Sequence, residues 1–75
     1  MLKAFFPMVS KPSEGTLAVA WHMAYGDDYQ TTAKLLHVPY GTVDSRLVRL
    51  REQLGVHTTG QAVQICLDNG WMPEP

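Results

Sequence analysis

The chain has 75 residues, a length that allows one small domain and excludes a two-domain enzyme or a doubly wound sheet. Hydrophobic residues make up 45% of the chain and charged residues 17%, a balance that is typical of a globular protein and excludes a disordered one. The formal net charge is −1, with 6 Lys and Arg against 7 Asp and Glu, so the chain as a whole is not basic.

Residue counts exclude further classes of site. Cys66 is the only cysteine, which excludes an internal disulfide and a cysteine-cluster metal site. His22, His37 and His57 are spread over three segments, so we expect no metal site. No nucleophile, base and oxyanion donor can be assembled, and the sequence predicts neither an enzyme nor a cofactor. No apolar run approaches the ~20 residues of a membrane span, and residues 1–10 lack a signal-peptide pattern, so we expect a cytoplasmic protein without a membrane partner.

Residues 1–12 contain two prolines and two phenylalanines and show no helical period, which predicts an irregular arm. Leu2, Phe5 and Phe6 are apolar side chains that water disfavours. We therefore expect the arm to pack either on the domain or on a partner.

The first helix is predicted over 13–25. Ser13 can accept a hydrogen bond from a free backbone N–H at the helix start, and Glu14 suits the positive end of the helix dipole. Apolar residues then recur at helical spacing as far as Gly26, which can end the helix in a left-handed conformation.

A second, shorter helix is predicted over 28–37. Asp27 and Gln30 have the three-residue spacing of a capping box, so we expect them to cap its N-terminus. His37 stands where tight turns often use glycine, and histidine tolerates a positive φ better than most residues. Pro39 suits the turn that follows.

The third helix, predicted over 40–54 and ended by Gly55, has the clearest period in the chain. Its apolar residues fall at i, i+4, i+7 and i+11 and form one narrow stripe: Val43, Leu47, Leu50 and Leu54. All three arginines of the chain lie within six positions of this helix: Arg46, Arg49 and Arg51. Such a cluster indicates either a solvated helix face or a surface that contacts phosphates, and charge alone favours the solvated face.

A fourth helix is predicted over 58–69, where Thr58 and Gln61 have the spacing of a second capping box. Apolar residues lie on two of its faces, and a short helix of this kind often has two neighbours, its own core and a second chain. Gly70 ends the helix. The chain thus divides into an arm over 1–12, a domain over 13–72 and a tail over 73–75.

Two short helices joined by a tight turn, the second of them rich in arginine, are typical of a helix-turn-helix motif. A helix fits the major groove of DNA, where its outward residues meet base edges. The crossing of the two helices requires a small residue, which Ala33 supplies, and Val43 is the expected buried anchor ten positions later.

The run from Thr32 to Met72, TAKLLHVPYGTVDSRLVRLREQLGVHTTGQAVQICLDNGWM, resembles a LuxR/GerE-type DNA-binding domain. The pieces that carry the resemblance are AKLLHV, GTV, RLREQLGV and TGQAV with the closing glycine, and SEGTLAVAWHMAYG resembles the first helix of that family. The resemblance implies an all-α domain with four helices, including a scaffold helix over 29–37, a recognition helix over 40–54 and a dimerisation helix over 58–69.

The function that this resemblance implies is a bacterial or phage transcription regulator that binds specific double-stranded DNA as a homodimer. The expected DNA-binding residues are Lys34, Tyr40, Thr42, Asp44, Ser45, Arg46, Val48 and Arg49. The expected dimer contacts are Ala62, Val63 and Cys66.

Each expected DNA contact has a physical reason and a structural alternative. Arginine can bridge guanine O6 and N7 or clamp a phosphate, but Arg46 and Arg49 could instead pair with acidic neighbours. Val48 could contact a thymine methyl or be an ordinary exposed residue. Asp44 could accept from cytosine N4, although a role in the first turn of the helix is the preferred interpretation. Thr42 could donate to a phosphate or act as a cap.

A second hypothesis is a helix-turn-helix protein that binds another transcription regulator instead of DNA, as an anti-activator or adaptor. The chain has Asp44 and Gln53 where the family often has basic residues, and Pro39 where it often has a serine cap. Fewer cations weaken the attraction to phosphates, and the net charge of −1 favours this second hypothesis.

Overall fold

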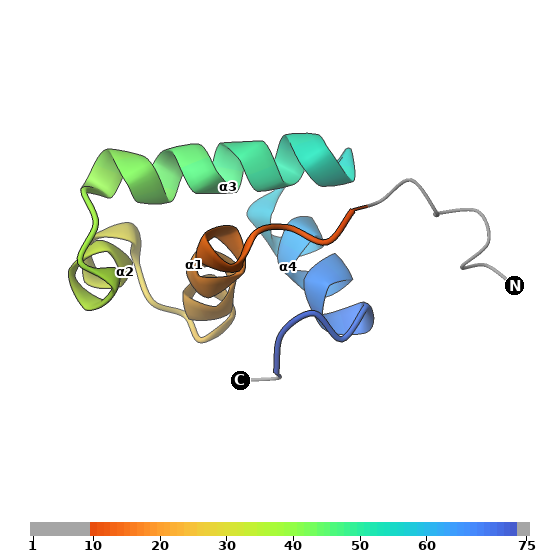
Figure 1. The fold of residues 1–75 in the computed structure, drawn as a ribbon, viewed down its shortest axis with the longest axis horizontal. Helices are drawn as coiled ribbons and strands as arrows, with labels where there is room; N and C mark the ends of the chain where they lie inside the picture. Colours follow the sequence, from red (N-terminus) through yellow and green to blue (C-terminus); the bar gives the residue numbers. More distant parts are fainter. Residues whose placement is uncertain (1–9, 74–75) are drawn as a thin grey trace, which may run out of the picture.

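The computed structural model describes residues 10–73. This part of the chain is all-helical and contains no strand, which confirms the prediction of an all-α domain with four helices. The helices are α1 (Glu14–Ala24), α2 (Tyr29–Leu36), α3 (Tyr40–Leu54) and α4 (Thr59–Asp68) (Figure 1). None of them combines the length and the apolar character that a bilayer-spanning helix needs.

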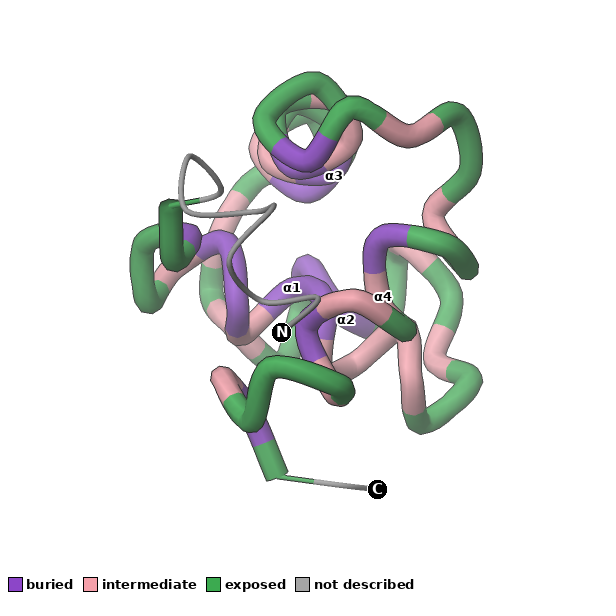
Figure 2. Tube along the Cα trace, turned by 90° about the vertical axis from the view of Figure 1, so that its right-hand side faces the viewer, coloured by how far each residue is buried: buried purple, intermediate pink, exposed green. Residues whose placement is uncertain are grey.

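Helix α3 lies along one side of the domain, and the other three helices all lie on the same side of it (Figures 1 and 2). Helices α1 and α3 each contact all of the other three helices. Helices α2 and α4 each contact α1 and α3 but, within residues 10–73, do not contact each other. One long face of α3 is therefore packed and the opposite face is left uncovered by the described helices.

The core forms where the apolar stripe of α3 meets the other helices. Val43, Leu47 and Leu50 are fully buried and Leu54 is nearly so, as their spacing predicts. The other buried apolar residues come from the remaining helices and the C-terminal segment: Leu17, Val19, Ala20, Ala33, Ala62, Cys66 and Met72. Each fully buried Leu or Val stabilises the fold by about 1.5–3 kcal/mol relative to its exposed form. Burial of this stripe thus fixes which face of α3 remains outside.

Caps at the first two helices explain where they begin. Ser13 caps α1 by accepting from the backbone N–H of Thr16, as predicted. The predicted capping box of Asp27 and Gln30 is wrong, because α2 begins one residue later and Asp28 is its N-cap. The Asp28 Oδ1 atom accepts from the backbone N–H of Thr31 at 2.7 Å.

The turn between α2 and α3 is tight and depends on a histidine. His37 adopts a left-handed conformation with φ 58° and ψ 43°, as the sequence predicts for this position. Its neighbour Val38 donates its backbone N–H to the Ala33 carbonyl at 3.0 Å, which closes the turn. Ala33 and Val43 are both buried at the crossing of the two helices, as expected of a helix-turn-helix motif. The turn and the crossing together fix the angle of α3.

The last helix and the two ends of the described chain are held by contacts with the rest of the domain. Thr58 and Gln61 form the predicted capping box at the start of α4. Beyond α4 the chain is not helical, yet Met72 is buried and completes the core. Of the predicted arm only residues 10–12 are described; they are not helical, and the Gln53 Nε2 atom donates to the Ser10 carbonyl at 3.0 Å. Leu2, Phe5 and Phe6 lie outside the described residues.

Candidate nucleic-acid interface

The uncovered face of α3 is the candidate interface. Burial of the apolar stripe turns the residues between its members away from the core, and Figure 2 shows α3 buried on the side facing the other helices. The exposed charged or hydroxyl side chains on this helix are Tyr40, Asp44, Ser45, Arg49 and Glu52. The face is therefore mainly polar, as a surface for DNA or for a polar protein partner requires.

The N-terminal end of α3 has free hydrogen-bond donors. Pro39 is the N-cap and offers no side-chain cap, so the first backbone N–H groups of the helix receive no side-chain partner among the described residues. Tyr40 is 54% exposed, and its ring lies 5.5 Å from the ring of Tyr29 on α2. Thr42 is half-buried, and its carbonyl accepts from Ser45 Oγ at 3.2 Å. This end of the helix can thus bind an anion such as a phosphate.

Arg46 does not belong to the uncovered face. Its side chain is half-buried and turns toward α1, where Nη1 lies 3.5 Å from the carbonyl oxygen of Gly15. Arg46, an expected DNA contact, is thus engaged within its own domain, where its guanidinium packs against α1. The sequence placed it at the flank of the apolar stripe, and a flanking arginine can reach a neighbouring helix with its long stem.

A second arginine of α3 is also engaged within the domain. Arg51 Nη1 donates to Thr59 Oγ1 at 3.0 Å and connects the end of α3 to the start of α4. Arg49 is exposed and makes no hydrogen bond or ion pair with another residue of the range 10–73. Of the three clustered arginines, Arg49 is thus the one available to a ligand on this face.

The remaining predicted contacts are placed as follows. Lys34 is exposed on α2. Val48 is half-buried and not fully exposed, so less of its side chain than expected is available to a thymine methyl. Asp44 is exposed and is the fifth residue of α3, so the preferred interpretation that it acts in the first turn is wrong. Asp44 therefore contributes a negative charge to the uncovered face.

An open cleft of about 490 Å³ adjoins the N-terminal end of α3. Its lining residues are Met23, Asp27, Asp28, Tyr29, Gln30 and Tyr40. The Asp27 Oδ2 atom lies 2.9 Å from His22 Nδ1, and Asp28 caps α2, so both carboxylates already have partners in the domain. Their charges nevertheless make the surface beside Tyr40 more acidic than a phosphate-binding surface usually is.

Two of the three predicted dimer contacts are buried in the core of the domain. Ala62 and Cys66 are 0% exposed, because their spacing of four residues places both on the face of α4 that packs on α1 and α3. Burial raises the pKa of the Cys66 thiol, which keeps this sulfur protonated and unreactive. Val63 is half-buried and is the one member of the set that a partner could touch.

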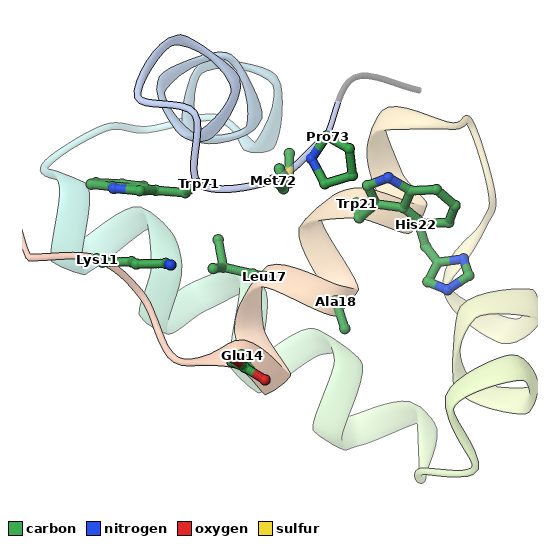
Figure 3. A pocket seen from close by; sticks show the side chains of 9 residues that line it. All are labelled: Lys11, Glu14, Leu17, Ala18, Trp21, His22, Trp71, Met72 and Pro73. Atoms are coloured by element: carbon green, nitrogen blue, oxygen red, sulfur yellow. The ribbon is translucent and has the colours of Figure 1, made fainter.

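The sequence did not predict a groove on the other side of α1 (Figure 3). It has a volume of about 360 Å³ and is lined by Lys11, Glu14, Leu17, Ala18, Trp21, His22, Trp71, Met72 and Pro73. Both tryptophans of the chain border it, but they lie about 50 positions apart in sequence, so no local pattern indicated the groove. Nowhere in residues 10–73 do three His, Cys, Asp or Glu residues gather closely enough to hold a metal ion.

Comparisons with known proteins found no relative of this chain: no family model matches it, and no curated protein matches it. The resemblance to LuxR/GerE-type domains accordingly depends on the quoted motifs alone.

Proposed function

We propose that the protein binds double-stranded DNA and regulates transcription, with α3 as the recognition helix. The observation that carries this proposal is the position of α3, which lies outside the other three helices and presents an uncovered polar face along its length. An α-helix with its side chains is about 10–12 Å across and the major groove is about 12 Å wide, so such a helix can enter the groove.

Within this proposal, each residue on or beside the uncovered face of α3 has a role in DNA binding. Arg49 reaches a guanine edge or a phosphate, and Ser45 meets a base edge beside it. Tyr40 and Thr42, with the free N–H groups at the start of α3, hold a backbone phosphate. Lys34 on α2 adds a second positive charge near the DNA. Arg46 has no direct part, since it packs against Gly15.

The quoted motifs support the finer assignment to a LuxR/GerE-type regulator that works in the cytoplasm as a homodimer. A dimer through α4 would place two half-sites about one helical turn, ~34 Å, apart on the DNA. Because Ala62 and Cys66 are buried, such a dimer would use Val63 together with the exposed polar side of α4, which includes Gln61 and Gln64.

A specific observation favours the second candidate function, an adaptor that binds another regulator. The exposed charged residues of α3 are Asp44, Arg49 and Glu52, whose charges sum to −1, and the cleft beside Tyr40 is acidic. DNA repels such a surface more than a basic one, whereas a basic segment of a partner protein would be attracted to it.

The test is a titration of a fluorescently labelled mixed-sequence duplex, followed by anisotropy at low salt and at about 0.15 M salt. We expect binding at low salt that weakens as salt rises, since phosphate contacts release counterions. Arg49→Gln should weaken it. Lys11→Gln removes one positive charge as well, but on the groove side of α1, and should not. Equal losses in both variants would contradict binding through α3, and no binding at low salt would favour the adaptor.

A further inference from the structure

The groove between α1 and the C-terminal segment has a largely apolar floor. Leu17 and Met72 are buried at its base, while Trp21 and Trp71 stand at its sides and remain partly exposed (Figure 3). Two half-exposed indole rings in one groove leave apolar surface in contact with water, which costs free energy unless something covers it. The groove is thus a site that favours an apolar occupant.

Trp21 supplies a second, independent reason to expect an occupant. Its indole Nε1 atom is buried and has no hydrogen-bond partner among residues 10–73. A buried N–H without an acceptor costs about 1–3 kcal/mol, and tryptophan N–H groups in proteins usually have a partner. An occupant that brings a carbonyl oxygen to this atom would remove that cost.

The chain itself provides a segment with the required chemistry. Residues 1–9 precede the described part, and they include the large apolar side chains of Leu2, Phe5 and Phe6. Lys11, near the point at which this segment joins the domain, lines the groove. Phe5 lies five positions before Ser10, and an extended run of five residues spans up to about 18 Å, whereas the seven steps from Glu14 to Trp21 rise only about 10 Å along α1. The segment is therefore long enough to reach both tryptophans.

We propose that residues 1–9 of the same chain dock in this groove. Phe5 and Phe6 cover the indole rings of Trp21 and Trp71, and a backbone carbonyl of the segment accepts the hydrogen bond from Trp21 Nε1. No residue of α3 lines the groove, so the docked segment completes the core without covering the candidate DNA-binding face. The proposal therefore stands independently of the proposed function.

The first test uses the unmodified chain. Trp21 and Trp71 are its only tryptophans and both line the groove, so the indole signals report on this site alone. We expect nuclear Overhauser effects between the ring protons of Phe5 or Phe6 and the indole protons, together with slow exchange of the Trp21 indole N–H. In a mixture of labelled and unlabelled chains, isotope filtering should show that these contacts are within one chain.

The second test compares two variants of the segment by tryptophan fluorescence. The double variant Phe5→Ser with Phe6→Ser should shift the emission to longer wavelength and increase quenching by acrylamide. Lys3→Ser changes the same segment without removing an apolar side chain and should leave both readouts unchanged. Far-ultraviolet circular dichroism checks that the helices are retained.

Three results would overturn the proposal. The first is an absence of contacts between the phenylalanines and the indoles in the unmodified chain. The second is the finding that such contacts exist only between different chains, since the occupant would then be a second copy. The third is indole contacts from Glu74 or Pro75 in place of the phenylalanines, because the occupant would then be the C-terminal end.

Discussion

Arg46 and Gly15, which are 31 positions apart in sequence, form a direct contact between α3 and α1: Arg46 Nη1 lies 3.5 Å from the Gly15 carbonyl oxygen. The absence of a side chain at position 15 makes room for the guanidinium, because a Cβ atom there would lie 3.2 Å from Arg46 Cζ. A residue that the sequence assigns to DNA contact thus acts at the junction of two helices. Arg46 is thus engaged in packing between helices, whereas Arg49 is exposed on the uncovered face of α3.

Arg46→Ala should destabilise the domain. The variant removes the packed stem of the side chain and its long hydrogen bond to Gly15, and we expect a loss of about 0.5–1.5 kcal/mol in the free energy of unfolding. Urea unfolding followed by circular dichroism measures this loss. Arg49→Ala is the matched control and should leave the free energy of unfolding within about 0.5 kcal/mol of wild type. A stable Arg46→Ala variant with weakened DNA binding would reverse the assignment.

Arg49→Ala should instead weaken DNA binding. If Arg49 reads a guanine, binding falls by about 1–3 kcal/mol on the best sequence and discrimination at that base pair relaxes. If it contacts a phosphate, binding falls on all sequences and the slope of log K against log salt decreases by about one unit. Anisotropy titrations at several salt concentrations distinguish the two roles. Unchanged affinity on every duplex would remove Arg49 from the interface.

Thr32→Val should stabilise the domain. Thr32 is fully buried on α2, and its Oγ1 atom has no hydrogen-bond partner among residues 10–73. Valine has nearly the same shape and lacks the unsatisfied hydroxyl, so we expect a gain of about 1 kcal/mol in thermal or urea unfolding. The exposed neighbour Thr31 provides the control substitution Thr31→Val, which should have little effect. A clear loss of stability in Thr32→Val would mean that the hydroxyl has a partner.

Asp28→Asn should make the free energy of unfolding depend less on pH at acidic pH. The backbone N–H of Thr31 donates to the Asp28 carboxylate and lowers the pKa of this group below its ordinary value of 3.8. A pKa lowered by folding stabilises the native state above the unfolded pKa, and this contribution is lost as pH falls through the folded pKa. Asparagine also caps helices but does not titrate. Wild type should therefore lose stability relative to Asp28→Asn below about pH 4, and parallel profiles would contradict this role.

The fold could be predicted from the sequence because its signals are local. Capping residues lie within three positions of the groups that they cap, and the stripe from Val43 to Leu54 follows from the helical period alone. The turn could be predicted because Pro39 interrupts the helical pattern, and His37 tolerates the positive φ of this position better than most residues. Even the error at the start of α2 amounts to one residue, since Asp27 and Asp28 are both good caps.

The candidate site could be predicted only in part, since its residues depend on contacts between distant elements. The sequence places Arg46 at the flank of a stripe, but only the packing of α1 on α3 shows that Gly15 leaves space for it. Ala62 and Cys66 share a face of α4, and periodicity cannot say whether that face meets the core or a second chain. The groove beside Trp21 and Trp71 joins residues about 50 positions apart, which no local pattern indicates.

The most direct test of DNA binding by α3 is an NMR titration of the labelled protein with a mixed-sequence duplex, first at low and then at physiological salt. At low salt we expect shift changes in the backbone signals of Tyr40, Ser45 and Arg49, while the signals of α4 stay unchanged. These shift changes should disappear as the salt concentration rises. The absence of any shift at low salt, where even non-specific binding appears, would contradict the assignment of α3 as a DNA-recognition helix.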